Sequence, residues 1–137
     1  MVSLSVAPLD IVTKNHLNVL IQLAQADKHF DAAEREMIFR IGREKNFPEE
    51  DVLNLMQNPE PIGTLGALSN NQKLNYLLDC IELVFVDKKV FENELNFCRS
   101  IAIKMGLNKN VIDFLIENRK NYGKEELKER VFNEFMA

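Results

Sequence analysis

The chain has 137 residues, of which 46% are hydrophobic and 28% are charged, and its formal net charge is −4 at pH 7. This length and this mixture are typical of one globular domain, and they exclude an intrinsically disordered chain. The negative charge argues against nonspecific nucleic-acid binding, which depends on clustered Lys and Arg side chains. We therefore expect no nucleic-acid partner.

Neither the N-terminus nor any internal segment predicts a membrane location. The stretch MVSLSVAPLD lacks a basic region and a long apolar run, so we do not expect it to act as a signal peptide. The longest apolar stretch, IELVFVD, contains Glu82 and is too short to span a bilayer. Cys80 and Cys98 lie among apolar residues without CxxC spacing, which favours buried, reduced thiols. We expect a cytoplasmic protein with no membrane insertion.

Apolar residues recur at helical spacing along almost the whole chain, and no segment alternates with period two for long enough to demand a strand. The sequence predicts an all-α fold, a compact orthogonal bundle of about seven helices. The apolar stripes that define them are Leu17, Leu20, Ile21 and Ala24; Met37, Ile38 and Ile41; Val52, Leu55 and Met56; Leu74, Leu77, Leu78, Ile81, Val84 and Phe85; Leu95, Cys98, Ile101, Ala102 and Met105; Val111, Ile112, Leu115 and Ile116; and Leu127, Val131 and Phe135.

Several residues predict where these helices begin and end. Asp31, followed three residues later by Glu34, fits the acidic form of a capping box. Pro48 suits the start of a helix, where its missing N–H would have no partner in any case. Gly106 is expected to end a helix, and Asn108 to cap the next one.

The two halves of the chain resemble each other when the first is shifted by sixty residues. The stretch NPEPIGTLGALSNN (58–71), with two Pro and two Gly, separates them as a loop. We predict an internal duplication, with repeats at about 15–58 and 75–118 and a C-terminal helix at about 124–136, within a single domain of residues 1–137. Chance similarity between two helix hairpins is the alternative. The coinciding pairs include Asn15 with Asn75, Leu17 with Leu77, Ile21 with Ile81, Leu23 with Leu83, Asp27 with Asp87, Lys28 with Lys88 and Glu34 with Glu94.

Four acids stand out in these repeats. Asp27 and Asp87 each fall in the last turn of a helix, where a carboxylate is disfavoured by roughly 0.3–1 kcal/mol. Glu34 and Glu94 follow seven residues later, and a short turn can fold each Glu back towards its Asp. Carboxylate oxygens suit hard cations such as Ca²⁺ or Mg²⁺, so these four acids are the candidate metal ligands.

Structural roles compete with this metal hypothesis. Asp31 and Glu34 can simply cap a helix, although Phe91 at the equivalent position of the second half cannot. Asp27 and Asp87 can accept hydrogen bonds from the turn backbone or pair with basic neighbours. Those neighbours, which would also weaken a cation site, are Lys28, His29, Lys88 and Lys89.

No catalytic motif accompanies the acids. GxSxG, GxxxxGK[ST], GxGxxG and HExxH are all missing from the sequence, and an enzyme is not expected. A carboxylate–metal hydrolase built on the acidic hairpins is a third hypothesis. The tail ERVFNEFMA is expected to dock on the core, and its apolar face would invite a partner if it were exposed.

The stretches AQADKHFDAAEREMIFRIGREKNF and ELVFVDKKVFENELNFCRSIAIKMGL together resemble the TerB-like family, which is named for tellurite resistance. Its hallmark is an all-helical domain of two similar halves, each with a helix ending in an A-D-G-x-h-x-x-x-E type hairpin. The resemblance covers residues 15–118. It implies that Asp27, Glu34, Asp87 and Glu94 correspond to the family's acidic residues, for which metal binding is inferred.

The resemblance also implies a bacterial stress context and association with partner proteins rather than a reaction. We therefore interpret the chain as a non-enzymatic helical interaction or scaffold module. The alternative is a protein that binds or senses a divalent cation through its paired acidic hairpins.

Overall fold

A computed structural model describes residues 7–26, 30–86 and 89–137. These residues form seven α-helices and contain no β-strand beyond one isolated bridge between Leu107 and Met136. The predicted all-α fold of about seven helices is confirmed. Within the described ranges, no helix is both long enough and apolar enough to cross a lipid bilayer.

Contacts divide the chain into two compact units, Met1–Ile62 and Gly63–Ala137, which we call the first and second unit. The division falls inside the loop that the sequence predicts at 58–71. That the whole chain acts as a single domain stays a prediction.

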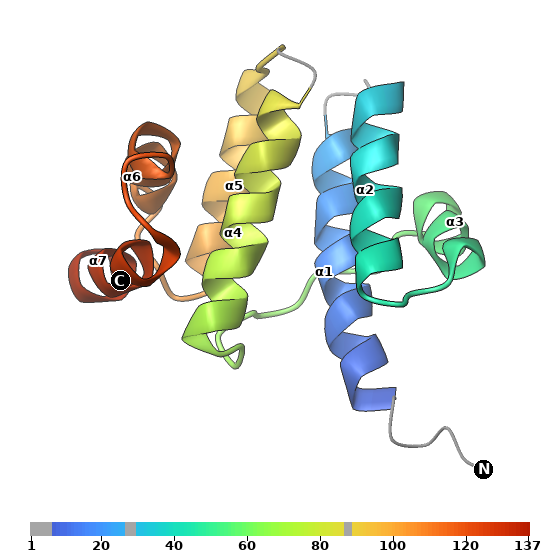
Figure 1. The fold of residues 1–137 in the computed structure, drawn as a ribbon, viewed down its shortest axis with the longest axis horizontal. Coiled ribbons are helices and arrows are strands. Elements are labelled where there is room, and N and C mark those ends of the chain that lie inside the picture. Colours follow the sequence, from blue (N-terminus) through green and yellow to red (C-terminus); the bar gives the residue numbers. More distant parts are fainter. Residues whose placement is uncertain (1–6, 27–29, 87–88) are drawn as a thin grey trace. The chain divides into compact units, whose positions relative to one another are not determined.

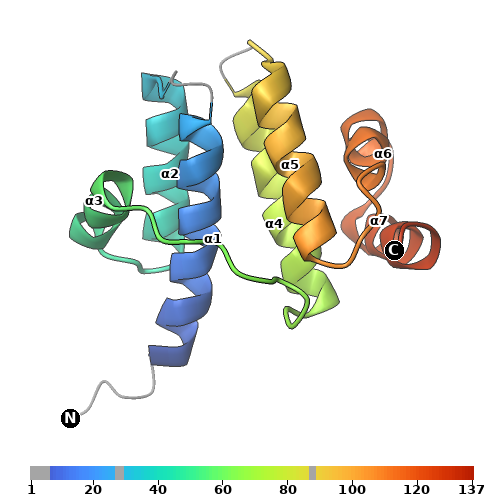
Figure 2. The same cartoon turned by 180° about the vertical axis from the view of Figure 1, so that it is seen from behind.

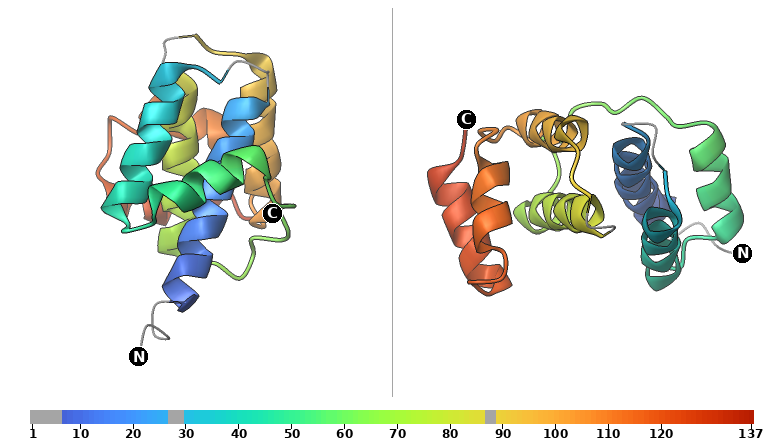
Figure 3. Two further views of the ribbon diagram at one scale, coloured as in Figure 1. Left: turned by 90° about the vertical axis from the view of Figure 1, so that its right-hand side faces the viewer. Right: turned by 90° about the horizontal axis from the view of Figure 1, so that it is seen from above.

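The first unit contains α1 (Ala7–Gln25), α2 (Ala32–Glu44) and α3 (Glu49–Gln57), each in contact with the other two. Helices α1 and α2 lie side by side and run in opposite directions, and α3 crosses them (Figures 1 and 3). Gly42 permits the close approach of α3, because a Cβ atom there would lie only 3.2 Å from Cγ2 of Val52. The amphipathic faces of three short helices thus close on one shared core.

The second unit contains α4 (Asn70–Phe85), α5 (Glu92–Lys104), α6 (Val111–Asn118) and α7 (Lys124–Glu134). Helices α4 and α5 form an antiparallel pair, which α6 contacts on both members (Figure 2). In each unit the first three helices therefore touch one another, and α7 is an addition to the second. The internal duplication itself stays a prediction.

The C-terminal helix is docked, as the sequence predicts. Helix α7 contacts α4 and α6, and Val131 is fully buried. The rings of Phe114 and Phe135 lie 5.1 Å apart, and the backbone N–H of Asn108 donates to the carbonyl oxygen of Phe135 at 2.6 Å. The tail therefore closes against the turn between α5 and α6.

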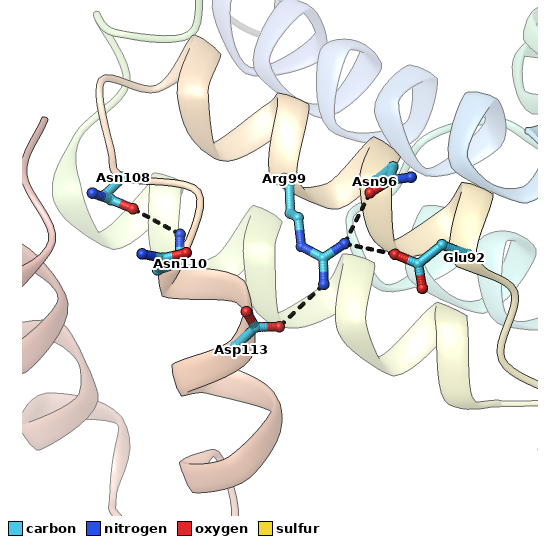
Figure 4. Close-up of polar contacts among 6 residues, drawn as sticks. All are labelled: Glu92, Asn96, Arg99, Asn108, Asn110 and Asp113. Carbon is cyan, nitrogen blue, oxygen red and sulfur yellow. Dashed lines mark hydrogen bonds and ion pairs between the residues drawn. The ribbon is translucent and has the colours of Figure 1, made fainter.

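Most of the predicted helix boundaries are confirmed. Asp31 and Pro48 are the N-caps of α2 and α3, and Gly106 follows α5 with φ +87°. The prediction for Asn108 is wrong in detail, because α6 begins later with Asn110 at its N-cap. Instead, Oδ1 of Asn108 accepts the backbone N–H of Asn110 at 2.9 Å (Figure 4).

Candidate functional site

The four predicted metal ligands are described only in part. Asp27 and Asp87 lie outside the described residues. Glu34 and Glu94 occupy the same place in α2 and α5, the third residue of each helix, and both are only 1% exposed. Among the described residues, no three His, Cys, Asp or Glu side chains are grouped so that they could hold a metal ion. The pairing of each Glu with its Asp stays a prediction.

Glu34 has a structural role of its own. The backbone N–H of Asp31 donates to Oε1 of Glu34 at 3.2 Å, and the backbone N–H of Glu34 donates to Oδ1 of Asp31 at 3.0 Å. This reciprocal capping box satisfies two backbone donors at the start of α2. In the second unit Phe91 is the N-cap of α5 and supplies no side-chain cap. The capping prediction for Asp31 and Glu34 is thereby confirmed.

The first unit contains a hollow that the sequence did not predict, which we call the α1–α3 groove. It has a volume of about 450 Å³, within the range of roughly 300–1,000 Å³ that is typical of ligand pockets. Helix α1, the turn between α2 and α3, α3 itself and the segment after it form its walls. Its lining includes the apolar Ile11, Phe47 and Leu55, the charged Lys14, Asp51 and Glu60, and the amides Asn54 and Asn58.

Amide side chains of α1 hold the segment after α3 in place. Asn18 accepts the backbone N–H of Glu60 at 2.9 Å through Oδ1 and donates to the carbonyl oxygen of Glu60 at 2.8 Å through Nδ2. Gln22 donates to the same oxygen at 2.5 Å, and Gln25 donates to the carbonyl oxygen of Met56 at 3.1 Å. This row of amides fixes one wall of the groove.

A spacing signal for this row exists in the sequence. Asn18, Gln22 and Gln25 stand at i, i+4 and i+7, so they share one face of α1. Apolar residues surround them, and Asn18 is only 4% exposed. Polar residues at helical spacing within an apolar helix indicate a buried polar contact, because a buried amide must find partners.

The groove carries more negative than positive charge. Nζ of Lys14 pairs with Oε2 of Glu60 at 2.7 Å, which balances one charge of each sign. Glu49, Glu50 and Asp51 form the first turn of α3, and no Lys or Arg of the described residues lies within ion-pair distance of them. The positive end of the α3 dipole offsets part of this charge.

Arg99 of the second unit is already occupied by acids of its own unit. Its guanidinium donates to Oε2 of Glu92 at 3.0 Å and to Oδ1 of Asn96 at 2.9 Å, and it pairs with Asp113 at 3.2 Å (Figure 4). The hydrogen bond that Arg99 donates to the Glu92 carboxylate is the main cause that raises the pKa of Arg99. These contacts tie α5 to α6, so we assign Arg99 a structural role.

The two thiols are buried and free, as predicted. A hydrogen bond with Cys98, together with burial, raises the pKa of the Cys80 thiol well above its ordinary value. Since the thiolate is the reactive form of cysteine, Cys80 is a weak nucleophile at neutral pH.

No protein-family model matches the chain, and no curated protein or solved structure matches it significantly. The resemblance to the TerB-like family therefore depends on the two hairpin stretches alone.

Proposed function

We propose that the chain is a non-enzymatic helical module that acts through protein contacts, and that the α1–α3 groove is its contact surface. The observation that carries this proposal is an exposed apolar side chain at a preformed hollow. Ile11 lines the groove and is 59% exposed, while Phe47 and Leu55 line it from buried positions. A hollow that combines an exposed aliphatic side chain with an apolar wall offers area that a partner would remove from water.

The way the groove is built favours binding. The hydrogen bonds of Asn18 and Gln22 order the segment after α3, and that of Gln25 holds the last turn of α3, before any partner arrives. A surface that is ordered in advance loses less conformational entropy on association. The groove therefore meets two requirements of a contact site, exposed apolar area and preorganisation.

Site-directed photocrosslinking in cells of the source organism tests this proposal. A benzophenone amino acid replaces Ile11 in one variant and Ile103 in a control variant. Both isoleucines lie on helices and are almost equally exposed, at 59% and 58%, but Ile103 does not line the groove. We expect protein adducts of defined mass at position 11 and none at position 103. Equal labelling at both positions, or no adduct at position 11, would contradict a contact role for the groove.

The family assignment and its setting are part of the same proposal. Membership of the TerB-like family, a bacterial stress response and a cytoplasmic location are supported by the hairpin stretches quoted above. Growth of a deletion strain on potassium tellurite, with and without the gene restored, tests the stress role. Unchanged growth after deletion would remove tellurite from the proposal.

Divalent-cation binding is the second candidate function. It is favoured by the placement of Glu34 and Glu94, two carboxylates that are 1% exposed at the same position of their helices. Ca²⁺ and Mg²⁺ prefer carboxylate oxygens as ligands, and in this candidate Asp27 and Asp87 would add their carboxylates to those of Glu34 and Glu94.

Titration calorimetry with Ca²⁺, Mg²⁺, Mn²⁺ and Zn²⁺ tests this second candidate. Binding heat should disappear in Asp27→Asn and Asp87→Asn and persist in Glu129→Gln, which removes an exposed acid of α7 that is not among the four candidate ligands. Silence with all four metals would refute the cation hypothesis.

A further inference from the structure

The residues of the α1–α3 groove indicate the chemistry of its occupant. We propose that the groove binds a short extended peptide segment that presents one aliphatic side chain next to a Lys or Arg. This inference rests on the proposed function and specifies the partner that the contact surface would take.

The apolar part of the groove selects the aliphatic side chain. Phe47 and Leu55 are 8% and 4% exposed and form the buried part of the lining, while Ile11 lines the groove with a side chain that is largely exposed to solvent. A side chain placed between them would remove apolar area from water on several sides. Such burial stabilises a complex by roughly 25 cal/mol per Å² before the costs of association.

The negative charge of the groove selects the basic residue. Asp51 lines the groove, and Glu49 and Glu50 precede it in the same helical turn. Because no described cation pairs with these acids, a Lys or Arg on the partner would supply the missing positive charge. An acidic segment, a phosphate group or an anionic lipid surface would be repelled by the same charges.

Two side-chain amides favour a peptide over a purely apolar ligand. Asn54 and Asn58 line the groove, and both are exposed. Among the residues that the structure describes, neither side-chain amide makes a hydrogen bond. Each amide offers donors and an acceptor, which are the groups that an extended peptide backbone requires. A second copy of this chain is disfavoured as the occupant, since its net charge of −4 meets an acidic groove.

Selection from a random peptide-display library against the full chain tests the proposal. We expect the enriched sequences to share an aliphatic residue beside a Lys or Arg. A fluorescent peptide of the enriched sequence should bind the natural chain and lose affinity as salt is raised, because salt screens the contact with Asp51.

Charge reversal provides the matched comparison. Asp51→Lys should weaken the selected peptide by about tenfold or more, the scale of one lost close charge contact. Glu129→Lys is the control, since Glu129 is an exposed acid on α7 that does not line the groove. The control should change the affinity by less than about twofold, and a peptide with Glu in place of its basic residue should regain affinity for Asp51→Lys.

Three outcomes would overturn the peptide proposal. The library could yield acidic or uncharged sequences, or it could yield no sequence whose binding Asp51→Lys weakens. The third outcome is that Asp51→Lys and Glu129→Lys change the affinity of the selected peptide equally. Photoadducts at position 11 that are insensitive to Asp51→Lys would leave the contact function standing while refuting this partner chemistry. No adduct at position 11 in a chain that keeps Asp51 would refute both proposals.

Discussion

At the scale of single residues, Asn18 is a buried polar residue in an apolar helix, and it links α1 to the segment after α3. It is 4% exposed, and its amide both accepts from and donates to the backbone of Glu60. This exchange gives the backbone N–H of Glu60 its acceptor, and it adds a second donor to the Glu60 carbonyl oxygen, which Gln22 also contacts. A side chain thus performs the task that a neighbouring strand performs in a sheet.

Replacing Asn18 with Asp should therefore destabilise the protein by about 1–3 kcal/mol, because Asp removes the donor to the Glu60 carbonyl and buries a charge. Asn15→Ala on the same helix is the control, because Asn15 is exposed. Its free energy of unfolding should lie within about 0.5 kcal/mol of that of the natural chain. Urea unfolding followed by circular dichroism measures both. Equal stabilities of the two variants would show that the amide row does not hold the groove wall.

The buried Tyr76 of α4 should make the stability of the fold depend on pH in the alkaline range. Burial raises the pKa of its phenol to about 12 from an ordinary value of 10.0. The unfolded chain then loses this proton at a lower pH than the folded chain, so deprotonation favours unfolding. The stabilising contribution is complete below pH 10.0 and is lost as the pH rises towards about 12.

We expect the free energy of unfolding to fall more steeply across that window in the natural chain than in Tyr76→Phe, which cannot titrate there. Denaturant unfolding at several alkaline pH values measures the two slopes, and the lysines that also titrate are common to both proteins. Parallel slopes would contradict the raised pKa.

At the scale of helices, Arg99 joins α5 to α6 through Asp113, and it also pairs with Glu92 of its own helix. The side chains of Glu92 and Asp113 are 70% and 55% exposed, whereas that of Arg99 is 23% exposed. Ion pairs this open to water contribute little, so Arg99→Gln should lower the free energy of unfolding by no more than about 1 kcal/mol. The loss should shrink at high salt, which screens the charges, and unfolding at two ionic strengths measures it. A loss that salt does not alter would assign the effect to packing of the arginine stem instead.

The helices themselves could be predicted from sequence, and their contacts largely could not. Spacing of apolar residues and local caps such as Asp31 with Glu34 act within one or two turns, where sequence neighbours are spatial neighbours. The bond between Asn18 and Glu60 joins residues 42 apart, and the groove needs side chains from α1, α3 and the turn before α3. Such a hollow depends on packing angles that the periodic pattern leaves open.

The candidate acids illustrate the same division. Capping by Glu34 follows from its spacing to Asp31, and it is confirmed. The burial of Glu94 does not follow from any local rule, because Phe91 offers no cap and a first-turn Glu is ordinarily exposed. Its burial depends on tertiary packing, which acts beyond the one or two helical turns that local rules cover.

At the scale of the whole molecule, the two units predict a division of stability. The second unit, residues 63–137, holds four helices, and its tail pairs with its own α5–α6 turn through the Asn108–Phe135 bond. The first unit, residues 1–62, has three helices and fewer residues over which to close a core. Because the fraction of surface buried rises with chain length, the shorter unit should be the less stable one.

We expect a fragment of residues 63–137 to be helical and to unfold cooperatively by itself, and a fragment of residues 1–62 to be only marginally folded. Circular dichroism during thermal unfolding of each fragment, compared with the intact chain, measures this difference. Mixing the fragments adds a second reading, since restoration of the intact thermal transition would mean that the units stabilise each other and act as the single domain that the sequence predicts. Two independent transitions that mixing does not change would instead show two domains, and an unfolded 63–137 fragment would contradict the stability that its helices and docked tail imply.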